Sequence, residues 1–228
     1  VKASCDPMST EPTRLIDYRP PAWRVRDVAL RFELDFVETR VFATLQLERH
    51  PERDDGEALC LHGEDLQLRM LRLDGRALTA DEYRSDAASL TIAGAPSPCT
   101  IETEVHIRPD KNTRLEGLYR SGSFLTTQCE AEGFRRITWF IDRPDVMATF
   151  RVRLEADRER FPVLLANGNP GESGRLPEGR HFAEWIDPWP KPSYLFAVVA
   201  GRLDCIEDHF RTMEGRDVRL RIYAEAQA

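Results

Sequence analysis

Apolar and polar residues alternate along much of this chain, with the period of two that is typical of strands with one buried face. The clearest run places five apolar side chains on one face: Val28, Leu30, Phe32, Leu34 and Phe36. A second run covers residues 41–47, and only four residues link it to the first. A link this short predicts an antiparallel hairpin.

Similar patterns recur to the end of the chain. They predict further strands at residues 66–73, 89–92, 101–107, 115–119, 124–129, 150–156, 163–166, 181–186, 194–200, 202–210 and 218–223. A change of phase within residues 66–73 predicts a bulge or the end of a strand. Residues 194–200 are apolar at every position, which predicts a central strand buried on both faces. Many short strands without a long amphipathic helix indicate an all-β fold of packed, mostly antiparallel sheets.

Three segments lack this alternation. Residues 187–192 contain three prolines, so we expect no regular structure there. Residues 1–13 are polar and predict a disordered leader, and the alternative that residues 1–7 are a non-native remnant before a native start at Met8 stays open. Residues 224–228 favour a helix and are expected to open a further segment.

Composition narrows the class of partner. The 228 residues are 41% hydrophobic and 31% charged, as in ordinary soluble globular proteins. The net charge of -7 argues against nucleic acid or an anionic membrane as the main partner. No segment predicts a membrane span or a signal peptide, and the five scattered cysteines form no Cys-x-x-Cys pair. A reducing cytoplasm is therefore the expected location.

One polar stretch has no evident folding role. In an extended backbone, Gln128, Glu130 and Glu132 would share one face, with Cys129 and Ala131 on the other. Two carboxylates beside an amide could bind a cationic group such as a free ammonium. Such side chains on a strand are also common as solvated surface residues, so the pattern alone leaves both interpretations open.

No complete active site is evident elsewhere. No two of the five histidines are four residues apart, which excludes a His-Glu-x-x-His zinc helix in this sequence. Nucleophile-elbow, phosphate-loop and dinucleotide motifs are missing too. Among the tryptophans, we expect Trp139 and Trp185 to fill the core, and Trp189, which lies between prolines, to be a surface candidate.

A series of longer motifs carries a resemblance to a known family. These motifs are Gly-Leu-Tyr-Arg-Ser-Gly at 117–122, Thr-Gln-Cys-Glu-Ala-Glu-Gly-Phe-Arg-Arg-Ile-Thr at 127–138, Asp-Arg-Pro-Asp-Val at 142–146, Leu-Ala-Asn-Gly-Asn at 165–169, and Lys-Pro-Ser-Tyr-Leu-Phe-Ala-Val-Val-Ala-Gly at 191–201. In this order they resemble the N-terminal domain of the bacterial aminopeptidase N family. Members of that family are zinc metallo-aminopeptidases of the gluzincin type. The resemblance runs from about residue 18 to residue 223.

The resemblance implies a domain organisation and a site. Residues 14–223 would form a saddle-like all-β domain that packs on a thermolysin-like catalytic domain, of which 224–228 would be the start. In such a domain the Gln and Glu of the Gln-x-Glu motif reach the active-site cleft. Glu130 would then bind the α-ammonium of a peptide substrate, and Gln128 would contact the substrate near its first residue. The resemblance assigns no role to Glu132 or Trp189.

The resemblance also implies what this stretch of sequence lacks. The family's zinc helix, its Gly-Ala-Met-Glu-Asn loop and its transition-state tyrosine would all follow residue 228. We therefore expect Zn²⁺ in the full-length enzyme, no metal ligand or catalytic residue here, and no activity from this chain alone. Two alternatives stay open: a non-catalytic relative that uses the domain as a scaffold for protein contacts, and an unrelated free-standing β-sandwich binding module.

Overall fold

The structure, a computed structural model, describes residues 14–53 and 56–225, and the predicted leader at 1–13 lies outside this part of the chain. Four short 3₁₀ helices occur, η1 (Leu15–Asp17), η2 (Pro109–Lys111), η3 (Gly133–Arg136) and η4 (Ser193–Leu195). The other elements are β1 (Trp23–Glu33), β2 (Thr39–Arg49), β3 (Leu59–His62), β4 (Gln67–Leu73), β5 (Arg76–Ala77), β6 (Tyr83–Ser85), β7 (Ser89–Ile92), β8 (Cys99–Ile107), β9 (Gly117–Ser121), β10 (Phe124–Gln128), β11 (Met147–Asp157), β12 (Val163–Ala166), β13 (Asn169–Arg175), β14 (Arg180–Pro192), β15 (Val198–Gly201), β16 (Asp204–Arg211) and β17 (Asp217–Ala224). The predicted all-β class is confirmed.

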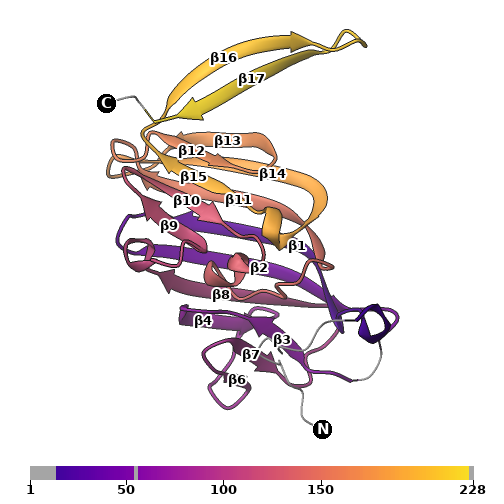
Figure 1. The fold of residues 1–228 in the computed structure, drawn as a ribbon. Coiled ribbons are helices and arrows are strands. Elements are labelled where there is room, and N and C mark those ends of the chain that lie inside the picture. The colour runs from indigo at the N-terminus through magenta and orange to yellow at the C-terminus, as the bar shows by residue number, and fades with distance from the viewer. Residues whose placement is uncertain (1–13, 54–55, 226–228) are drawn as a thin grey trace.

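The strands form four sheets. The largest has eight strands in the order β13-β14-β11-β1-β2-β8-β4-β5, and Figure 1 shows the four-stranded sheet β12-β15-β10-β9 stacked in front of it. A three-stranded sheet, β3-β7-β6, and the separate pair β16-β17 complete the set. Strands β1 and β11 pair in parallel, and the other pairs among the described residues are antiparallel. The mostly antiparallel character is thus also confirmed.

The alternation in the sequence locates most strands correctly. Strands β1 and β2 pair as the predicted hairpin, although β1 begins earlier and ends earlier than its clearest apolar run. The predicted bulge in β4 occurs between Leu68 and Met70. Strands β9 and β10 pair as a second hairpin across the turn at Gly122. Local pattern was sufficient in these cases because each strand has one face in the core.

The proline-rich segment corrects one prediction, because residues 187–192 belong to β14. The pairing of β14 with β11 jumps from Asp187, opposite Phe150, to Lys191, opposite Ala148. The intervening residues 188–190 form a bulge, which holds two of the three prolines where no ladder hydrogen bond is needed. The expectation of no regular structure was therefore wrong.

The apolar segment at 194–200 corrects a second prediction. Only Val198–Gly201 forms a strand, β15, which lies between β12 and β10 as a central strand. The preceding backbone bonds to a side chain instead of a neighbouring strand. Asn167 accepts a hydrogen bond from the Ala197 amide (2.6 Å) and donates one to the Leu195 carbonyl (3.1 Å). An amide side chain can replace a ladder partner in this way.

A cluster of aromatic rings fills the core beneath η3. Phe134 is fully buried, and its ring centroid lies 4.9 Å from that of Phe140, 5.0 Å from that of Phe196 and 6.0 Å from that of Phe150. Phe150 belongs to the eight-stranded sheet, whereas Phe196 precedes β15 of the four-stranded sheet. Phe134 therefore joins η3 to both sheets, and the edge-on ring geometry adds to the burial of apolar area.

Replacing Phe134 with alanine should leave a cavity at this junction. We expect Phe134→Ala to lower the free energy of unfolding by about 3–5 kcal/mol. Urea unfolding followed by fluorescence would measure the change. Phe210→Ala, at a ring that is 56% exposed, is the matched control and should have little effect. Equal losses in the two variants would contradict the junction role of Phe134.

Candidate functional site

The polar stretch at 128–132 lies where β10 ends. Gln128 is the last residue of β10 and pairs with Gly117 of β9. The chain then turns through Glu130 and Ala131, whose shared peptide bond is cis, and enters η3 at Gly133. The Gly133 amide donates a hydrogen bond to the Cys129 carbonyl (2.8 Å). The expectation that Gln128, Glu130 and Glu132 share one strand face was therefore wrong, because the strand stops before Glu130.

Two glycines allow this turn to fold so tightly. A Cβ atom on Gly133 would lie 2.5 Å from the Gln128 carbonyl oxygen and 3.0 Å from the Gly117 nitrogen. A Cβ on Gly117, where φ is +72°, would lie 2.7 Å from the Cβ of Arg136. Both positions exclude a side chain on steric grounds, and Gly117 also uses a backbone conformation that favours glycine. The glycines thus fix where the strand ends.

Two buried side chains, Cys129 and Phe134, anchor the turn in the core. Phe134 follows Gly133 directly and belongs to the aromatic cluster described above. Cys129 is 2% exposed, and its burial strongly raises the pKa of the thiol. A thiol held neutral in this way packs as a small apolar group and does not act as a nucleophile.

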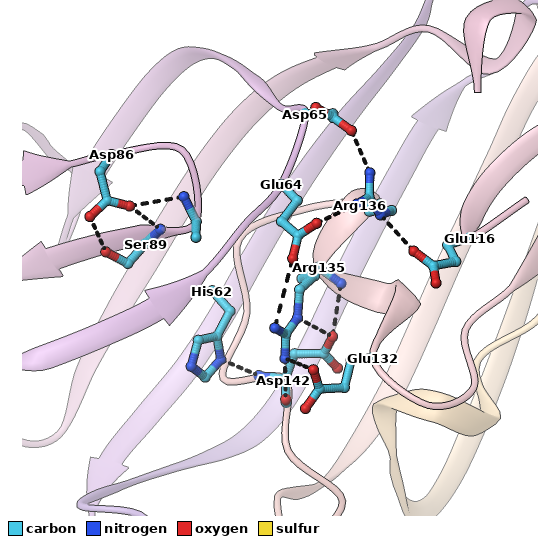
Figure 2. Close-up of polar contacts among 11 residues, drawn as sticks. His62, Glu64, Asp65, Asp86, Ser89, Glu116, Glu132, Arg135, Arg136 and Asp142 are labelled. Atoms are coloured by element: carbon cyan, nitrogen blue, oxygen red, sulfur yellow. Dashed lines mark hydrogen bonds and ion pairs between the residues drawn. The ribbon is translucent and has the colours of Figure 1, made fainter. Parts of the chain in front are cut away.

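Asp142, which is itself buried, joins η3 to two other segments, and Figure 2 shows its contacts with Arg135 and His62. Its Oδ2 accepts hydrogen bonds from the backbone amide and the Nε of Arg135, both at 3.1 Å. Its Oδ1 accepts a bond of 2.5 Å from the Ser193 hydroxyl of η4. The Asp142 backbone amide donates to Nδ1 of His62 at the end of β3 (3.1 Å). Three elements, η3, η4 and β3, thus meet at one residue.

The neighbouring guanidinium, Arg136, is also buried and is surrounded by carboxylates (Figure 2). It forms ion pairs with Glu64 and Asp65, and its Nε lies 3.1 Å from Glu116 Oε2. The loop after β3 and the segment before β9 are thereby joined to η3. Buried charges of this kind are stable only when they are paired and hydrogen-bonded.

The two glutamates of the stretch differ in their contacts. Glu132 forms an ion pair with Arg135, at 3.1 Å between Oε2 and Nη2. Glu130 is exposed, and no described side chain forms a hydrogen bond or ion pair with its carboxylate. Gln128 is exposed as well, and its Nε2 donates to the Glu130 carbonyl oxygen (3.3 Å). Of the two acids that the sequence brings together, only Glu130 has a free carboxylate.

The ion-pair network that follows the turn at Glu130 carries a surplus of negative charge. Arg135 and Arg136 supply two positive charges, whereas the carboxylates paired with them number five: Glu64, Asp65, Glu116, Glu132 and Asp142. An uncompensated cluster of this sign produces a potential that attracts cations. The free carboxylate of Glu130, on the turn that leads into this network, is itself chemically suited to bind a positively charged group.

This network has no local pattern in the sequence. Asp142 begins an Asp-Arg-Pro-Asp stretch, which is typical of a turn and carries no information about distant partners. The one signal in the sequence is the pair Arg135-Arg136 shortly after the acidic stretch, with Asp142 seven residues after Arg135. Glu64, which pairs with Arg136, and Ser193, which bonds to Asp142, are too distant in sequence to be matched without the tertiary structure.

Other candidate groups do not form a second site. Within the described ranges, no three His, Cys, Asp or Glu side chains are placed to hold a metal ion. The Thr127 hydroxyl accepts a hydrogen bond from the Val198 amide (2.9 Å), so it serves the junction of β10 and β15. Trp139 is buried and Trp185 is partly buried against the core, whereas Trp189 is 76% exposed, as the sequence predicted. No helix in the described part of the chain is long and apolar enough to span a bilayer.

Comparison with known proteins identifies the family. Residues 24–195 match the peptidase M1 N-terminal domain. This chain belongs to the peptidase M1 family. It is 53% identical over 211 residues to aminopeptidase N of Caulobacter vibrioides and 45% identical over 209 residues to aminopeptidase N of Escherichia coli. Each alignment covers 92% of this chain but 24% of the relative, so the chain spans about a quarter of the length of these curated M1 proteins.

Solved structures agree with this assignment. The structure of Legionella pneumophila aminopeptidase A in complex with aspartic acid superimposes with a TM-score of 0.88 at 34% identity, covering 93% of this chain and 25% of that protein. An M1 zinc metallopeptidase of Deinococcus radiodurans gives a TM-score of 0.75 at 15% identity, covering 90% of this chain and 48% of that protein, which shows the shared fold. The M1 N-terminal β domain is thus established for this chain, and an unrelated β-sandwich module is excluded.

The partly buried imidazole of His62 should make stability depend on pH. Burial, and then the positive charge of Arg135, lower the pKa of His62 from 6.5 to about 4. The folded state therefore favours the neutral ring. This contribution is fully present above pH 6.5 and is lost as the pH falls toward 4, with a total of roughly 3 kcal/mol. An NMR titration should show the His62 ring protonating near pH 4.

Unfolding experiments at pH 7 and pH 4.5 give an independent measurement. In His62→Asn, an amide oxygen could accept the hydrogen bond from Asp142 but would not titrate. We expect this variant to lose about 2 kcal/mol less than the parent between the two pH values. A His62 ring that titrates near 6.5, or equal losses in both proteins, would contradict the assignment.

Proposed function

We propose that this chain is the substrate-anchoring N-terminal domain of a zinc-dependent M1 aminopeptidase that removes N-terminal residues from peptides. Glu130 binds the α-ammonium of the substrate, and Gln128 contacts the substrate near its first residue. The observation that carries the proposal is the exposed, unpaired carboxylate of Glu130 on a turn that buried contacts fix in place. A free carboxylate in a fixed position is suited to recognise an ammonium group.

Recognition of this kind selects for exopeptidase substrates. A carboxylate in a partly desolvated cleft stabilises a free terminal ammonium, whereas an internal peptide bond offers it no charge. Gln128, held beside Glu130, supplies amide donors and an acceptor for the substrate backbone. The role of both residues is to position the substrate, so that the reacting bond lies where the chemistry occurs.

The names of the similar proteins support this reading. Two relatives are named aminopeptidase N, one similar structure is an aminopeptidase A with bound aspartic acid, and another is an M1 zinc metallopeptidase with a bound Tyr-Ser-Ala substrate. We infer peptides with a free N-terminus as the substrate class. We place the enzyme in the cytoplasm, on the sequence evidence alone.

Zinc would be held by the longer protein and not by the residues described here. The described residues include no trio of metal-binding side chains, so they do not fit a zinc site. We propose that the segment after residue 228 supplies the metal and the catalytic groups, and that the two parts of the chain pack together with Glu130 at their cleft. A non-catalytic relative would keep this domain but lack His-Glu-x-x-His in that segment.

Substitution of the two glutamates in the longer enzyme tests the anchoring role. We expect Glu130→Ala to reduce kcat/KM by about 10- to 100-fold, chiefly through KM, because one charge-assisted contact is lost. Zinc content should be unchanged. Glu132→Ala is the matched control, since Glu132 already pairs with Arg135, and should have a smaller effect on KM. Loss of zinc from the Glu130 variant, or equal effects of the two substitutions on KM, would contradict the assigned role.

The chain by itself should be inactive. Incubation of the 228-residue protein with Zn²⁺ and an aminoacyl chromogenic substrate should give no turnover above buffer, because residues 14–53 and 56–225 form no metal site that could activate a water molecule. The longer enzyme, assayed in parallel, serves as the positive control. Measurable turnover by the 228-residue chain that a chelator abolishes would refute this part of the proposal.

A further inference from the structure

A cavity of about 330 Å³ lies where β12, β13 and β14 meet β17 (Figure 1). None of its lining residues belongs to β9, β10 or η3, the elements around Glu130. Its volume falls at the lower end of the range of roughly 300–1,000 Å³ that is typical of small-molecule sites. The cavity is therefore a candidate ligand site in a different part of the domain from the turn at Glu130.

The floor of the cavity comes from β14. His181, Ala183 and Trp185 line it and share one face of that strand, because side chains alternate along a strand. In the pairing with β11, Ala183 lies opposite Leu154 and Trp185 lies opposite Val152, and both of these partners are buried. The floor is thus part of the core face. The small side chain of Ala183 between two rings leaves space there, and Ala183 and Trp185 remain partly exposed.

Hydrogen bonds to the backbone hold both rings in place. The Trp185 indole Nε1 donates to the carbonyl oxygen of Leu164 in β12 (3.2 Å). His181 Nε2 lies 2.8 Å from the carbonyl oxygen of Phe161, just before β12. The walls are therefore already ordered without a ligand, which lowers the entropic cost of binding.

Strand β13 supplies a free carboxylate. Its pairing with β14 is interrupted between Pro170 and Ser173, so Gly171 and Glu172 form a bulge. Glu172 lines the cavity and is exposed, and no side chain in the described ranges forms a hydrogen bond or ion pair with its carboxylate. This wall is suited to an ammonium group.

Strand β17 supplies a positive charge. The pair β16-β17 has an apolar face with exposed side chains, namely Ile206, Phe210, Leu220 and Ile222. Arg221 and Tyr223 alternate onto the opposite face and line the cavity. Arg221 uses its Nε for a hydrogen bond to Glu207 (3.0 Å), so its terminal nitrogens are not committed to a carboxylate. This wall is suited to an anion.

We propose that the cavity binds a free α-amino acid with an apolar side chain. The side chain packs on Trp185 over Ala183, the α-ammonium pairs with Glu172, and the α-carboxylate pairs with Arg221. An apolar floor between one free acid and one available base matches such a zwitterion. The choice of ligand rests on the proposed function, since an aminopeptidase releases free amino acids. Binding itself needs neither zinc nor turnover.

Titration of the 228-residue chain with L-phenylalanine, followed by NMR of the indole N–H groups, tests the site. We expect the Trp185 resonance to shift and to saturate with a Kd of about 1 mM, because the ligand is small. The indoles of Trp23, Trp139 and Trp189 do not line the cavity and serve as internal controls. A Trp185 resonance that does not move at about ten times that concentration would overturn the proposal.

Ligand analogues test the two charge contacts without any substitution in the protein. Phenethylamine lacks the carboxylate, 3-phenylpropionate lacks the ammonium, and N-acetylphenylalaninamide lacks both charges. Each should bind at least about tenfold more weakly than L-phenylalanine, because a charge-assisted contact is lost. Equal affinity for the uncharged analogue would show only an apolar cavity and would contradict the proposed ligand class.

Substitutions assign the contacts to residues. Glu172→Gln and Arg221→Gln should each weaken binding about tenfold. Glu207 keeps Arg219 as a partner in the second variant. Glu214→Gln, at an exposed acid outside the cavity, is the matched control and should bind as the parent does. Unchanged affinity in both cavity variants would overturn the proposal.

Two further measurements separate this inference from the proposed function. Glu130→Ala should leave the affinity for L-phenylalanine unchanged, whereas loss of binding would place the ligand at the turn and overturn the cavity site. A longer protein with the Trp185 shift but no peptidase activity would contradict the proposed function and leave this inference intact. Peptidase activity without the shift would do the reverse.

Discussion

The buried ion pair between Asp142 and Arg135 is the interaction on which the rest of the site depends. The carboxylate of Asp142 also accepts a bond from Ser193 of η4, and the Asp142 backbone amide donates to His62 of β3, so three elements take their positions from one residue. Removing one partner of such a pair leaves an uncompensated buried charge, which typically costs 3–5 kcal/mol. The pair therefore acts less as a source of net stability than as a constraint on where η3 lies.

Fixing η3 also fixes the turn that precedes it. Arg135 takes Glu132 as a second partner, and the close packing at glycines 117 and 133 leaves no space for a side chain at either position. Glu130 is then the one acid of the stretch without an internal partner in the described chain. A free carboxylate on a rigid turn loses little conformational entropy on binding, which favours recognition of a cation over a flexible surface acid. The packing that forms the core thus also fixes the position of the turn that carries Glu130.

Two surfaces of the molecule remain incompletely matched, the turn at Glu130 and the apolar face of β16 and β17. The turn exposes an unpaired carboxylate, and the face of β16 and β17 exposes apolar side chains. The rest of the described chain has one hydrophobic core and carries the M1 N-terminal fold. This contrast is typical of a domain that is stable in its own core but acts as part of a larger chain.

The sequence by itself determined the all-β class, most of the strands and the two hairpins β1-β2 and β9-β10, because strands with one buried face leave a period of two in the sequence. It also placed Gln128 and Glu130 as candidates through a family resemblance. Only the tertiary structure decided that β10 stops at Gln128, that Glu132 is occupied by Arg135, and that prolines 188 and 190 fit a bulge in β14. These outcomes depend on contacts between residues that are distant in the chain, such as Asp142 with Ser193, and local periodicity carries no information about such contacts.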